Sequence, residues 1–300
     1  IERERPDIIE SDDPYQVGWK ALRLGNTHRI PIVAFYHSHF AEAYLRRAAE
    51  RVGRWFSELV MRAARGYVSS FYNRFAVTLT PSAGISRVLG EWGVANVRKA
   101  SLGVNTDVFH PGTYAPDDER TRLLYVGRLA PEKNTRTLCE AFSILAARSD
   151  RFELVVVGEG QERERLRRVQ EATGRVHWIR YCAEPAELAR FYRKADLFVH
   201  PGVEETFGLV ALEAQACGTP VVGIRCTHMD EVILHEQSDW AEENTAEALA
   251  AAIERMSARL DLATLGLFAA REVARCYAWP NVFAHLFSIY EEVVARYRKR

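Results

Sequence analysis

Short apolar runs alternate along this chain with stretches of helical periodicity, and this alternation restricts the possible folds more than any other feature of the sequence. Runs rich in Val, Ile, Leu and Phe are typical of strands that are buried on both faces of a parallel sheet. In the first third of the chain, such runs predict strands at 7–10, 30–36, 76–80 and 97–101. Strands that alternate with helices indicate an α/β fold made of β-α units around parallel sheets.

A polar connection that carries proline and glycine, residues 103–120, separates these units from a second set. The second set predicts strands at 122–127, 152–158, 176–179, 196–200 and 219–224, and helices at 135–148, 161–172, 185–194 and 207–217. The tail, residues 244–300, is predicted to be helical with an interruption at Trp279-Pro280.

At 300 residues the chain is long enough for two domains of about 100 to 200 residues each. We expect an N-terminal domain over 1–106, a C-terminal domain over 107–280, and a final helix over 281–300 that returns toward the N-terminal domain. Because the chain begins with Ile1 almost inside a strand, we expect a front portion of the N-terminal domain to be absent from this sequence.

Composition and charge exclude several classes of protein. No apolar run approaches the roughly 18 residues of a membrane-spanning helix, and residues 1–10 do not resemble a signal peptide, so we expect a cytoplasmic protein. The five cysteines include no C-x-x-C pair, which argues against a disulfide framework or a zinc knuckle. Residues 14–106 hold 13 Lys and Arg against 4 Asp and Glu, which suggests an anionic partner. No known nucleic-acid-binding motif accompanies this excess, so it does not indicate nucleic-acid binding.

Two glutamates, Glu205 and Glu213, stand eight residues apart where the chain is predicted to pass from a loop into the helix at 207–217. Gly218 and Pro220 are typical of residues that follow a helix C-terminus. Glu205 is therefore expected in the loop before the helix, and Glu213 about two turns along it. The predicted apolar face of this helix carries Leu209, Leu212 and Ala216.

The start of that helix predicts an anion site, because the N–H groups of a first turn have no partners inside the helix. The residues concerned are Thr206, Phe207, Gly208, Leu209 and Val210. A phosphate bound there would repel a glutamate, so Glu205 and Glu213 are expected to accept hydrogen bonds from neutral hydroxyls of the same ligand. Hydroxyls that flank a diphosphate describe a nucleotide sugar. Alternatively, Glu205 is a solvated loop residue and Glu213 a charge on the helix surface.

Two cations, Arg128 and Lys133, follow the strand at 122–127, just before a helix that Asn134 or Thr135 is placed to cap. Arginine binds phosphate oxygens through its planar fork, and lysine binds them as a point charge. Together they suit a diphosphate leaving group. The alternative is that both are ordinary solvated loop residues.

A pair of histidines, His37 and His39, follows the apolar strand at 30–36 in the N-terminal domain. One hypothesis is that the pair contacts the substrate from an interdomain cleft. A second is a capping or core histidine. A metal site is the third, although no further ligand is apparent nearby.

Several common nucleotide-binding patterns are missing. Gly158-x-Gly160 is followed by Arg163 where G-x-G-x-x-G needs a third glycine, which disfavours a nicotinamide dehydrogenase. No G-x-x-x-x-G-K-[ST] loop occurs, which disfavours a P-loop kinase. No D-x-D occurs either, so we expect a diphosphate to be held by Arg128, Lys133 and backbone N–H groups instead of a metal, with no cofactor.

The stretches GVNTDVFHP, LLYVGRLAPEKN, LVVVGEGQERERL and ADLFVHPGVEETFGLVALEAQACGTPVV, in this order, resemble the family-four (group 1) retaining glycosyltransferases with the GT-B fold. The resemblance extends from about Pro6 to the C-terminus. It implies two facing Rossmann-like domains, with the nucleotide-sugar donor held mainly by the C-terminal one and the acceptor by the N-terminal one. The acceptor is expected to be a hydroxyl of a glycan, a lipid or a small molecule.

The resemblance also implies residue roles. Glu205 matches the glutamate that contacts the transferred sugar, and Glu213 the one that binds the ribose hydroxyls. Arg128 and Lys133 match the diphosphate ligands, and the backbone from 207 to 210 matches phosphate and sugar contacts. Tyr181 and Cys182 fall where the nucleobase touches the main chain. His37 matches a histidine near the sugar, and His39 is its rival.

The chain departs from the family pattern in two places. The family's glycine-rich first loop would precede Ile1, and the segment 235–249 lacks the glycine-containing strand that often follows the last donor strand. Two rival functions remain on this architecture: a sugar phosphorylase or sugar-nucleotide epimerase, and a non-catalytic sugar-nucleotide-binding subunit.

The stretch from 41 to 66 predicts a contact with an anionic membrane surface, such as the inner face of the plasma membrane. It interleaves six arginines with aromatic and aliphatic residues, as an interfacial amphipathic helix does. The alternative is that its apolar residues pack on the sheet and its arginines are solvated.

Overall fold

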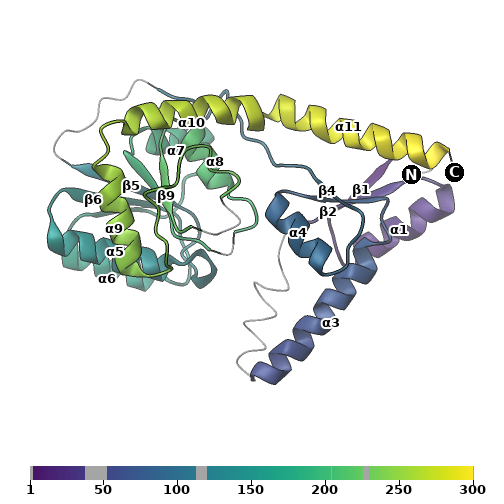
Figure 1. Ribbon diagram of the computed structural model, residues 1–300, viewed down its shortest axis with the longest axis horizontal. Helices are drawn as coiled ribbons and strands as arrows, with labels where there is room; N and C mark the ends of the chain where they lie inside the picture. The colour runs from purple at the N-terminus through teal and green to yellow at the C-terminus, as the bar shows by residue number, and fades with distance from the viewer. Residues whose placement is uncertain (1–2, 38–52, 113–119, 204, 226–229, 300) are drawn as a thin grey trace. The chain divides into compact units, whose positions relative to one another are not determined.

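The computed structural model describes residues 3–37, 53–112, 120–203, 205–225 and 230–299. The chain divides into two compact units (Figure 1). Unit 1 comprises residues 1–102 and 280–300, and unit 2 comprises residues 103–279. These divisions fall slightly earlier in the chain than the sequence placed them, because Val104 already pairs with Ala278 in unit 2.

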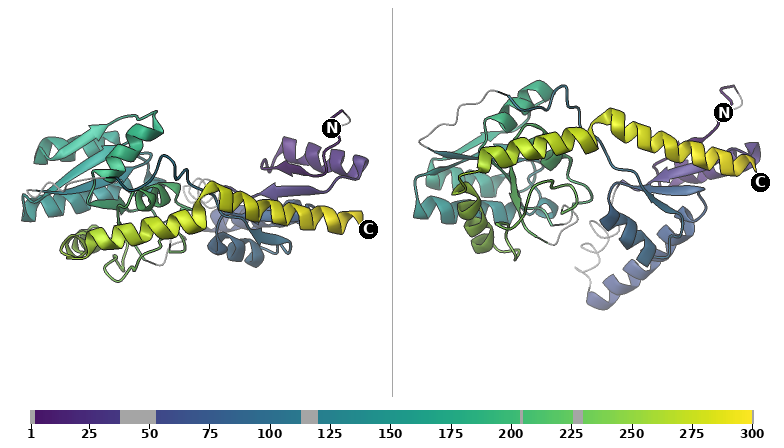
Figure 2. Two further views of the ribbon diagram at one scale, coloured as in Figure 1. Left: turned by 90° about the horizontal axis from the view of Figure 1, so that it is seen from above. Right: turned by 45° about the horizontal axis from the view of Figure 1, so that its top comes forward.

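Unit 1 contains a parallel sheet of four strands in the order β1-β2-β3-β4. The strands are β1 (Ile9–Ser11), β2 (Ile32–Phe35), β3 (Val77–Thr80) and β4 (Val97–Lys99). The helices of this unit are α1 (Gln16–His28), α3 (Arg54–Tyr72), α4 (Ala83–Glu91) and α11 (Trp279–Arg298). In Figures 1 and 2, α11 runs along this sheet.

Both faces of the unit 1 sheet are buried. Successive side chains of a strand point to opposite faces, and β2 follows this rule. Ile32 and Ala34 pack in a cluster with Phe71 of α3. Val33 packs on the other face, in a cluster with Ile289 of α11. The C-terminal helix therefore supplies one of the two covers of the sheet.

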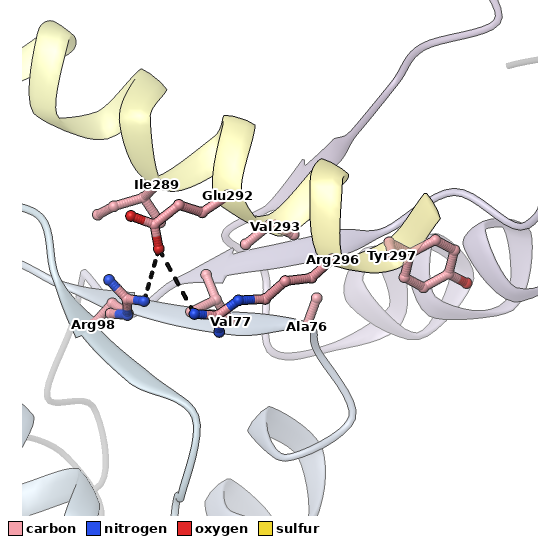
Figure 3. Close-up of a pocket in the computed structure, with 8 residues that line it drawn as sticks. All are labelled: Ala76, Val77, Arg98, Ile289, Glu292, Val293, Arg296 and Tyr297. Atoms are coloured by element: carbon pink, nitrogen blue, oxygen red, sulfur yellow. Dashed lines mark hydrogen bonds and ion pairs between the residues drawn. The ribbon is translucent and has the colours of Figure 1, made fainter. Parts of the chain in front are cut away.

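Apolar packing holds α11 more strongly than its ion pairs do. Figure 3 shows Ile289 and Glu292 of α11 above β3 and β4, around a cavity of about 120 Å³. Ile289 is 2% exposed, and such burial is worth about 1.5–3 kcal/mol. The Glu292 carboxylate lies 2.9 Å from the Arg98 guanidinium, but both side chains are about half exposed, and exposed pairs contribute roughly 0.2–1 kcal/mol.

Unit 2 contains a parallel sheet of five strands in the order β7-β6-β5-β8-β9. The strands are β5 (Thr121–Val126), β6 (Phe152–Val157), β7 (Val176–Ile179), β8 (Leu197–His200) and β9 (Val221–Gly223). The helices are the 3-10 turn η2 (Pro131–Lys133), α5 (Thr135–Arg148), α6 (Arg163–Thr173), α7 (Pro185–Arg193), α8 (Leu209–Ala216), α9 (Ala246–Ser257) and α10 (Leu262–Tyr277). Helix α5 contacts α6 and α9, whereas α8 contacts α7 and α10, which gives the sheet two helical layers.

The predicted strands and helices of the β-α units are present, with ends that differ by at most two residues. The tail differs more from the prediction, because it contains a second break between α9 and α10 in addition to the one at Ala278, before Trp279-Pro280. The segment after β9 also differs. Ala241 forms an isolated parallel bridge with Ile224, so a rudimentary pairing exists where no strand was expected.

The strand order creates a switch point in unit 2. From β5 the chain moves outward through β6 to β7, then returns to the other side of β5 as β8 and continues to β9. In such open parallel sheets, ligands bind at the carboxyl ends of the strands where the order reverses. In unit 2 this position lies between the ends of β5 and β8.

Two glycines pack the loops beside this position. A side chain at Gly158 would place its Cβ 2.0 Å from the Gly127 carbonyl oxygen, and one at Gly160 would lie 2.3 Å from the Leu129 carbonyl oxygen. The Gly158-x-Gly160 pattern is thus explained by close contact between the loops after β5 and β6, and not by a dinucleotide.

No helix among the described residues is sufficiently long and apolar to cross a lipid bilayer.

Candidate active site

The segments that carry Lys133 and Glu205 meet at the switch point of unit 2, although 72 residues separate them in the sequence. Lys133 Nζ donates to Glu205 Oε2 at 2.5 Å. A second contact ties the same loops together, because Asn134 Nδ2 donates to the Pro201 carbonyl at 2.9 Å. The two sequence patterns predicted to share a ligand therefore lie side by side.

Glu205 lies in a pocket of mixed charge. Its side chain is 17% exposed, and the ring Nε2 of His200 lies 3.9 Å from its Oε2. Burial alone would raise the pKa of the Glu205 carboxyl, but the Lys133 ammonium, His200 and Arg128 outweigh burial and lower the pKa. Burial lowers the pKa of His200, so its imidazole is neutral at neutral pH. Glu205 is therefore an ionised acceptor whose main partner is Lys133.

Arg128 lies on the rim of the same edge. Its Nη1 is 3.0 Å from Glu132 Oε1, and its side chain is 61% exposed. The Tyr125 hydroxyl donates to the Arg128 carbonyl at 2.9 Å and so holds the backbone at this position. Arg128 and Lys133 thus provide one exposed and one largely buried cation.

The helix after Glu205 begins later than the sequence predicted. α8 starts at Leu209, not at 207, with Gly208 as its N-cap at a φ of 90°, a conformation that favours glycine. Phe207 lies before the helix, 3% exposed, with its ring 6.0 Å from that of Tyr277. Leu209 was expected on the apolar face but is 39% exposed, because the buried face of α8 is formed by other residues, Ala211, Leu212, Ala214, Gln215 and Ala216.

The first turn of α8 has no side-chain cap, because its N-cap residue is Gly208. Within this turn, Ala211 N–H donates to the Gly208 carbonyl at 3.0 Å. Thr206 and Val210 flank this turn and are partly buried. At the other end, Gly218 N–H donates to the Gln215 carbonyl at 2.9 Å, which confirms the predicted C-terminal glycine.

Glu213 is neither an exposed surface charge nor an unpaired one. The Tyr192 hydroxyl of α7 donates to Glu213 Oε2 at 2.8 Å. Burial raises the pKa of the Glu213 carboxyl, and the bond from Tyr192 offsets part of that rise. The solvated-surface alternative for Glu213 is therefore wrong.

Comparison with known proteins matches both units. A family model described as Glycosyltransferase Family 4 matches residues 1–108, and one described as Glycosyl transferases group 1 matches residues 120–259. A GDP-mannose-dependent alpha-mannosyltransferase of Mycolicibacterium smegmatis is 30% identical over 304 residues, which cover 97% of this chain and 75% of that protein. The chain belongs to glycosyltransferase family 4.

Solved structures agree with this assignment at the level of fold. Sucrose-phosphate synthase from Thermosynechococcus elongatus matches with a TM-score of 0.75 at 23% identity, covering 97% of this chain and 74% of that one. Anabaena Alr3699/HepE in complex with UDP and glucose matches with a TM-score of 0.73 at 16% identity, covering 97% and 79%. The GT-B fold predicted from the sequence is confirmed for this glycosyltransferase.

Two further residues of the glycosyltransferase, Tyr181 and Cys182, follow the edge strand β7. Tyr181 is 80% exposed. The Cys182 thiol lies 3.6 Å from the Glu184 carbonyl and 3.6 Å from Glu187 Oε2. Both residues lie at the same carboxyl edge of the sheet as Arg128, with the end of β6 between them.

His37 belongs to unit 1 and follows β2, as predicted. Its ring stacks on Phe35, with centroids 4.1 Å apart and an interplanar angle of 3°, and its Nε2 lies 3.1 Å from Asp12 Oδ2. Near this pair, the Tyr290 hydroxyl donates to Glu10. Burial is the main cause that raises the pKa of the Glu10 carboxyl. His39 lies outside the described residues.

The sequence did not indicate the contacts that three residues make at this edge of the sheet. Tyr192 carried no signal, since its partner Glu213 is 21 residues away. His200 ends the predicted strand at 196–200, and nothing in the sequence indicates that its ring lies 3.9 Å from Glu205. Asn134 was expected to cap α5, yet its side chain bonds Pro201 and Asn244 and accepts from Thr137 instead.

Within the described part of the chain, no three His, Cys, Asp or Glu side chains gather as a metal-binding group.

Proposed function

We propose that this glycosyltransferase moves a sugar from a nucleotide-diphosphate sugar to an acceptor hydroxyl, with retention of the anomeric configuration and without a metal ion. The observation that carries the proposal is the meeting of Lys133 and Glu205 at the switch point, 2.5 Å apart. One side chain suits a phosphate oxygen and the other a sugar hydroxyl. A ligand that satisfies both has a phosphate next to a sugar.

In this proposal, Lys133 and Arg128 bind the diphosphate together with the N–H groups at the start of α8. Glu213, fixed by Tyr192, accepts hydrogen bonds from the ribose hydroxyls. Glu205 accepts a hydrogen bond from a hydroxyl of the transferred sugar. Two cations take the place that a metal would otherwise occupy beside the diphosphate.

The reaction requires no protein nucleophile. The bond between the anomeric carbon and the phosphate oxygen breaks, and both of its electrons leave with the diphosphate. The acceptor oxygen then bonds the anomeric carbon from the face the phosphate has left, and its proton passes to a phosphate oxygen. Lys133, Arg128 and the α8 N-terminus stabilise the negative charge that develops on the leaving group.

The nucleobase is proposed to lie against Tyr181 and Cys182. The relative from Mycolicibacterium smegmatis is named for GDP-mannose, and the Anabaena structure holds UDP. These names support a donor that consists of a nucleoside diphosphate and a sugar, but they do not identify its base. His37, in unit 1, is proposed to contact the sugar, with Asp12 orienting its ring.

We also propose that unit 1 binds an anionic membrane surface, which would bring the glycosyltransferase to a lipid-linked acceptor at the inner face of the plasma membrane. Helix α3 supports this, because Trp55 is 76% exposed, and Phe56 and Leu59 are also exposed beside Arg54 and Arg62. Aromatic side chains next to arginines suit an interfacial helix. The part of the predicted stretch before residue 53 lies outside the described residues.

A panel of nucleotide sugars tests the proposed function. The melting temperature of the protein is measured with each nucleotide sugar and each nucleoside diphosphate, and release of the diphosphate is followed over time. We expect one base to raise the melting temperature, because a ligand that binds only the folded state stabilises it. Phosphate-dependent turnover or epimerisation would identify the rival enzymes, and binding without turnover the non-catalytic subunit.

A further inference from the structure

Both cations proposed to hold the diphosphate already have carboxylate partners within the protein. Lys133 is bonded to Glu205, and Arg128 to Glu132. The two pairs differ in burial. The two carboxylates are similarly buried, with Glu132 18% and Glu205 17% exposed, but the Arg128 side chain is 61% exposed and that of Lys133 only 27%. Water therefore screens the first pair more strongly than the second, and Lys133 is the cation more firmly held by its own protein.

A diphosphate bound at Lys133 would share its ammonium group with Glu205. An ammonium group has three N–H donors, so it can bridge two acceptors. However, a phosphate oxygen brought to Lys133 would also come close to the negatively charged Glu205. Like charges near each other cost free energy, and the cost is larger in a partly buried site.

The sugar changes this balance. A nucleotide sugar carries hydroxyl donors next to its diphosphate, and Glu205 can accept a hydrogen bond from one of them. The carboxylate is then satisfied while Lys133 turns to the phosphate. A nucleoside diphosphate that has lost its sugar brings the same negative charge but no hydroxyl for Glu205.

We propose that Glu205 competes with the diphosphate for Lys133, and so weakens the binding of the nucleoside diphosphate product relative to the nucleotide-sugar donor. Glu205 is then a specificity-determining residue that favours product release. The inference rests on the proposed function, because it assumes that the ligand of this edge is a nucleotide sugar.

The test is isothermal titration of the wild type and Glu205→Gln with UDP, GDP, ADP, CDP and dTDP, and with the matching nucleotide sugars. Glutamine keeps the shape of the side chain and removes its charge. We expect Glu205→Gln to bind the preferred nucleoside diphosphate about fivefold more tightly than the wild type, the factor that corresponds to roughly 1 kcal/mol. The same variant should bind the nucleotide sugar no more tightly than the wild type.

Glu213→Gln is the matched control, because it removes a carboxylate of the same site that is bonded to Tyr192 and not to Lys133. Glu213→Gln should bind the nucleoside diphosphate more weakly than the wild type, not more tightly. In a Lys133→Met background, the gain from Glu205→Gln should fall to within about twofold, because the contested cation is gone. Circular dichroism and melting temperatures verify that each variant is folded.

The outcomes separate the two proposals. If the wild type binds none of the nucleoside diphosphates or nucleotide sugars, the proposed function fails and the inference fails with it. If the wild type binds one of them and Glu205→Gln binds the diphosphate equally or more weakly, only the inference is overturned. A gain that persists unchanged in the Lys133→Met background would show general repulsion by Glu205 and overturn the role of Lys133.

Discussion

Tyr192 donates its hydroxyl hydrogen to Glu213 at 2.8 Å and so joins α7 to α8. Burial, followed by the charge of Glu213, raises the pKa of Tyr192, so the phenol keeps its proton at neutral pH. The carboxyl of Glu213 has a raised pKa because it too is buried. The protein therefore carries a carboxylate at a position that disfavours its charge.

We predict that Glu213→Gln is more stable than the wild type at neutral pH. Because the pKa of Glu213 is higher in the folded state than its ordinary value of 4.5, the folded protein keeps a proton that the unfolded chain has released between these two values. The free energy of unfolding therefore falls as pH rises through this window, and the variant lacks that loss. Urea unfolding from pH 4 to pH 8 measures it.

Glu164→Gln is the control for this experiment, because Arg167 lowers the pKa of the exposed Glu164. Because the folded-state pKa of Glu164 is lowered, Glu164 makes the free energy of unfolding rise with pH, and Glu164→Gln should lack that gain. A Glu213→Gln variant that is less stable than the wild type at pH 7 but not at pH 4 would contradict the predicted cost of the buried charge.

Removing Lys133 should weaken nucleotide-sugar binding more than removing Arg128. A charge-assisted hydrogen bond is worth about 1.5–3 kcal/mol, so Lys133→Met should raise the dissociation constant by about 10- to 150-fold. Arg128→Ala should have a smaller effect because its side chain is more exposed. Arg136→Ala, an exposed arginine on α5 paired with Glu140, should leave affinity unchanged. Equal affinities in all three variants would refute the diphosphate site.

The fold was predictable because each β-α unit has a local signal. The ends of α5 and β7 were predicted correctly, since polar turns bound both of their apolar patterns. The start of α8 was not, because Phe207 is apolar at helical spacing but packs on Tyr277, a contact made by a distant segment. Helical periodicity cannot distinguish an apolar residue inside the helix from one that precedes the helix and packs on a distant segment.

The sequence indicated that Lys133 and Glu205 share a ligand, but not that they pair with each other. Glu205 and Lys133 were each assigned to a ligand, yet their ion pair depends on the neighbouring positions of β5 and β8 in the sheet. Sequence spacing carries no information about that adjacency. For the same reason, Tyr192 as the partner of Glu213 became visible only when α7 and α8 were seen to pack together.

His37 and His39 give different predictions for turnover. If His37 contacts the sugar by a hydrogen bond worth about 0.5–1.5 kcal/mol, His37→Ala should lower kcat/KM by about 2- to 12-fold. His39→Ala should have no effect beyond the error of the assay. Initial rates with a saturating acceptor measure both. The reverse result would assign the role to His39.

Liposome flotation tests the membrane surface. Binding should increase with anionic lipid and decrease at high salt, because such attraction is screened over about 8 Å at physiological ionic strength. The double variant Trp55→Ser, Phe56→Ser should float less, whereas Leu267→Ser, which changes an exposed residue of unit 2, should not differ from the wild type. Absence of flotation at low salt on strongly anionic vesicles would leave a soluble acceptor as the better hypothesis.

The stereochemistry of the product tests whether the transfer is retaining and independent of a metal ion. The protein is treated with EDTA and incubated with the nucleotide sugar that it binds, and the first sugar product, whether transferred or hydrolysed, is followed by proton NMR at the anomeric hydrogen. We predict turnover in EDTA and a product with the same anomeric configuration as the donor. An inverted product, or turnover that appears only when Mg²⁺ or Mn²⁺ is restored, would contradict the proposed retaining, metal-independent transfer.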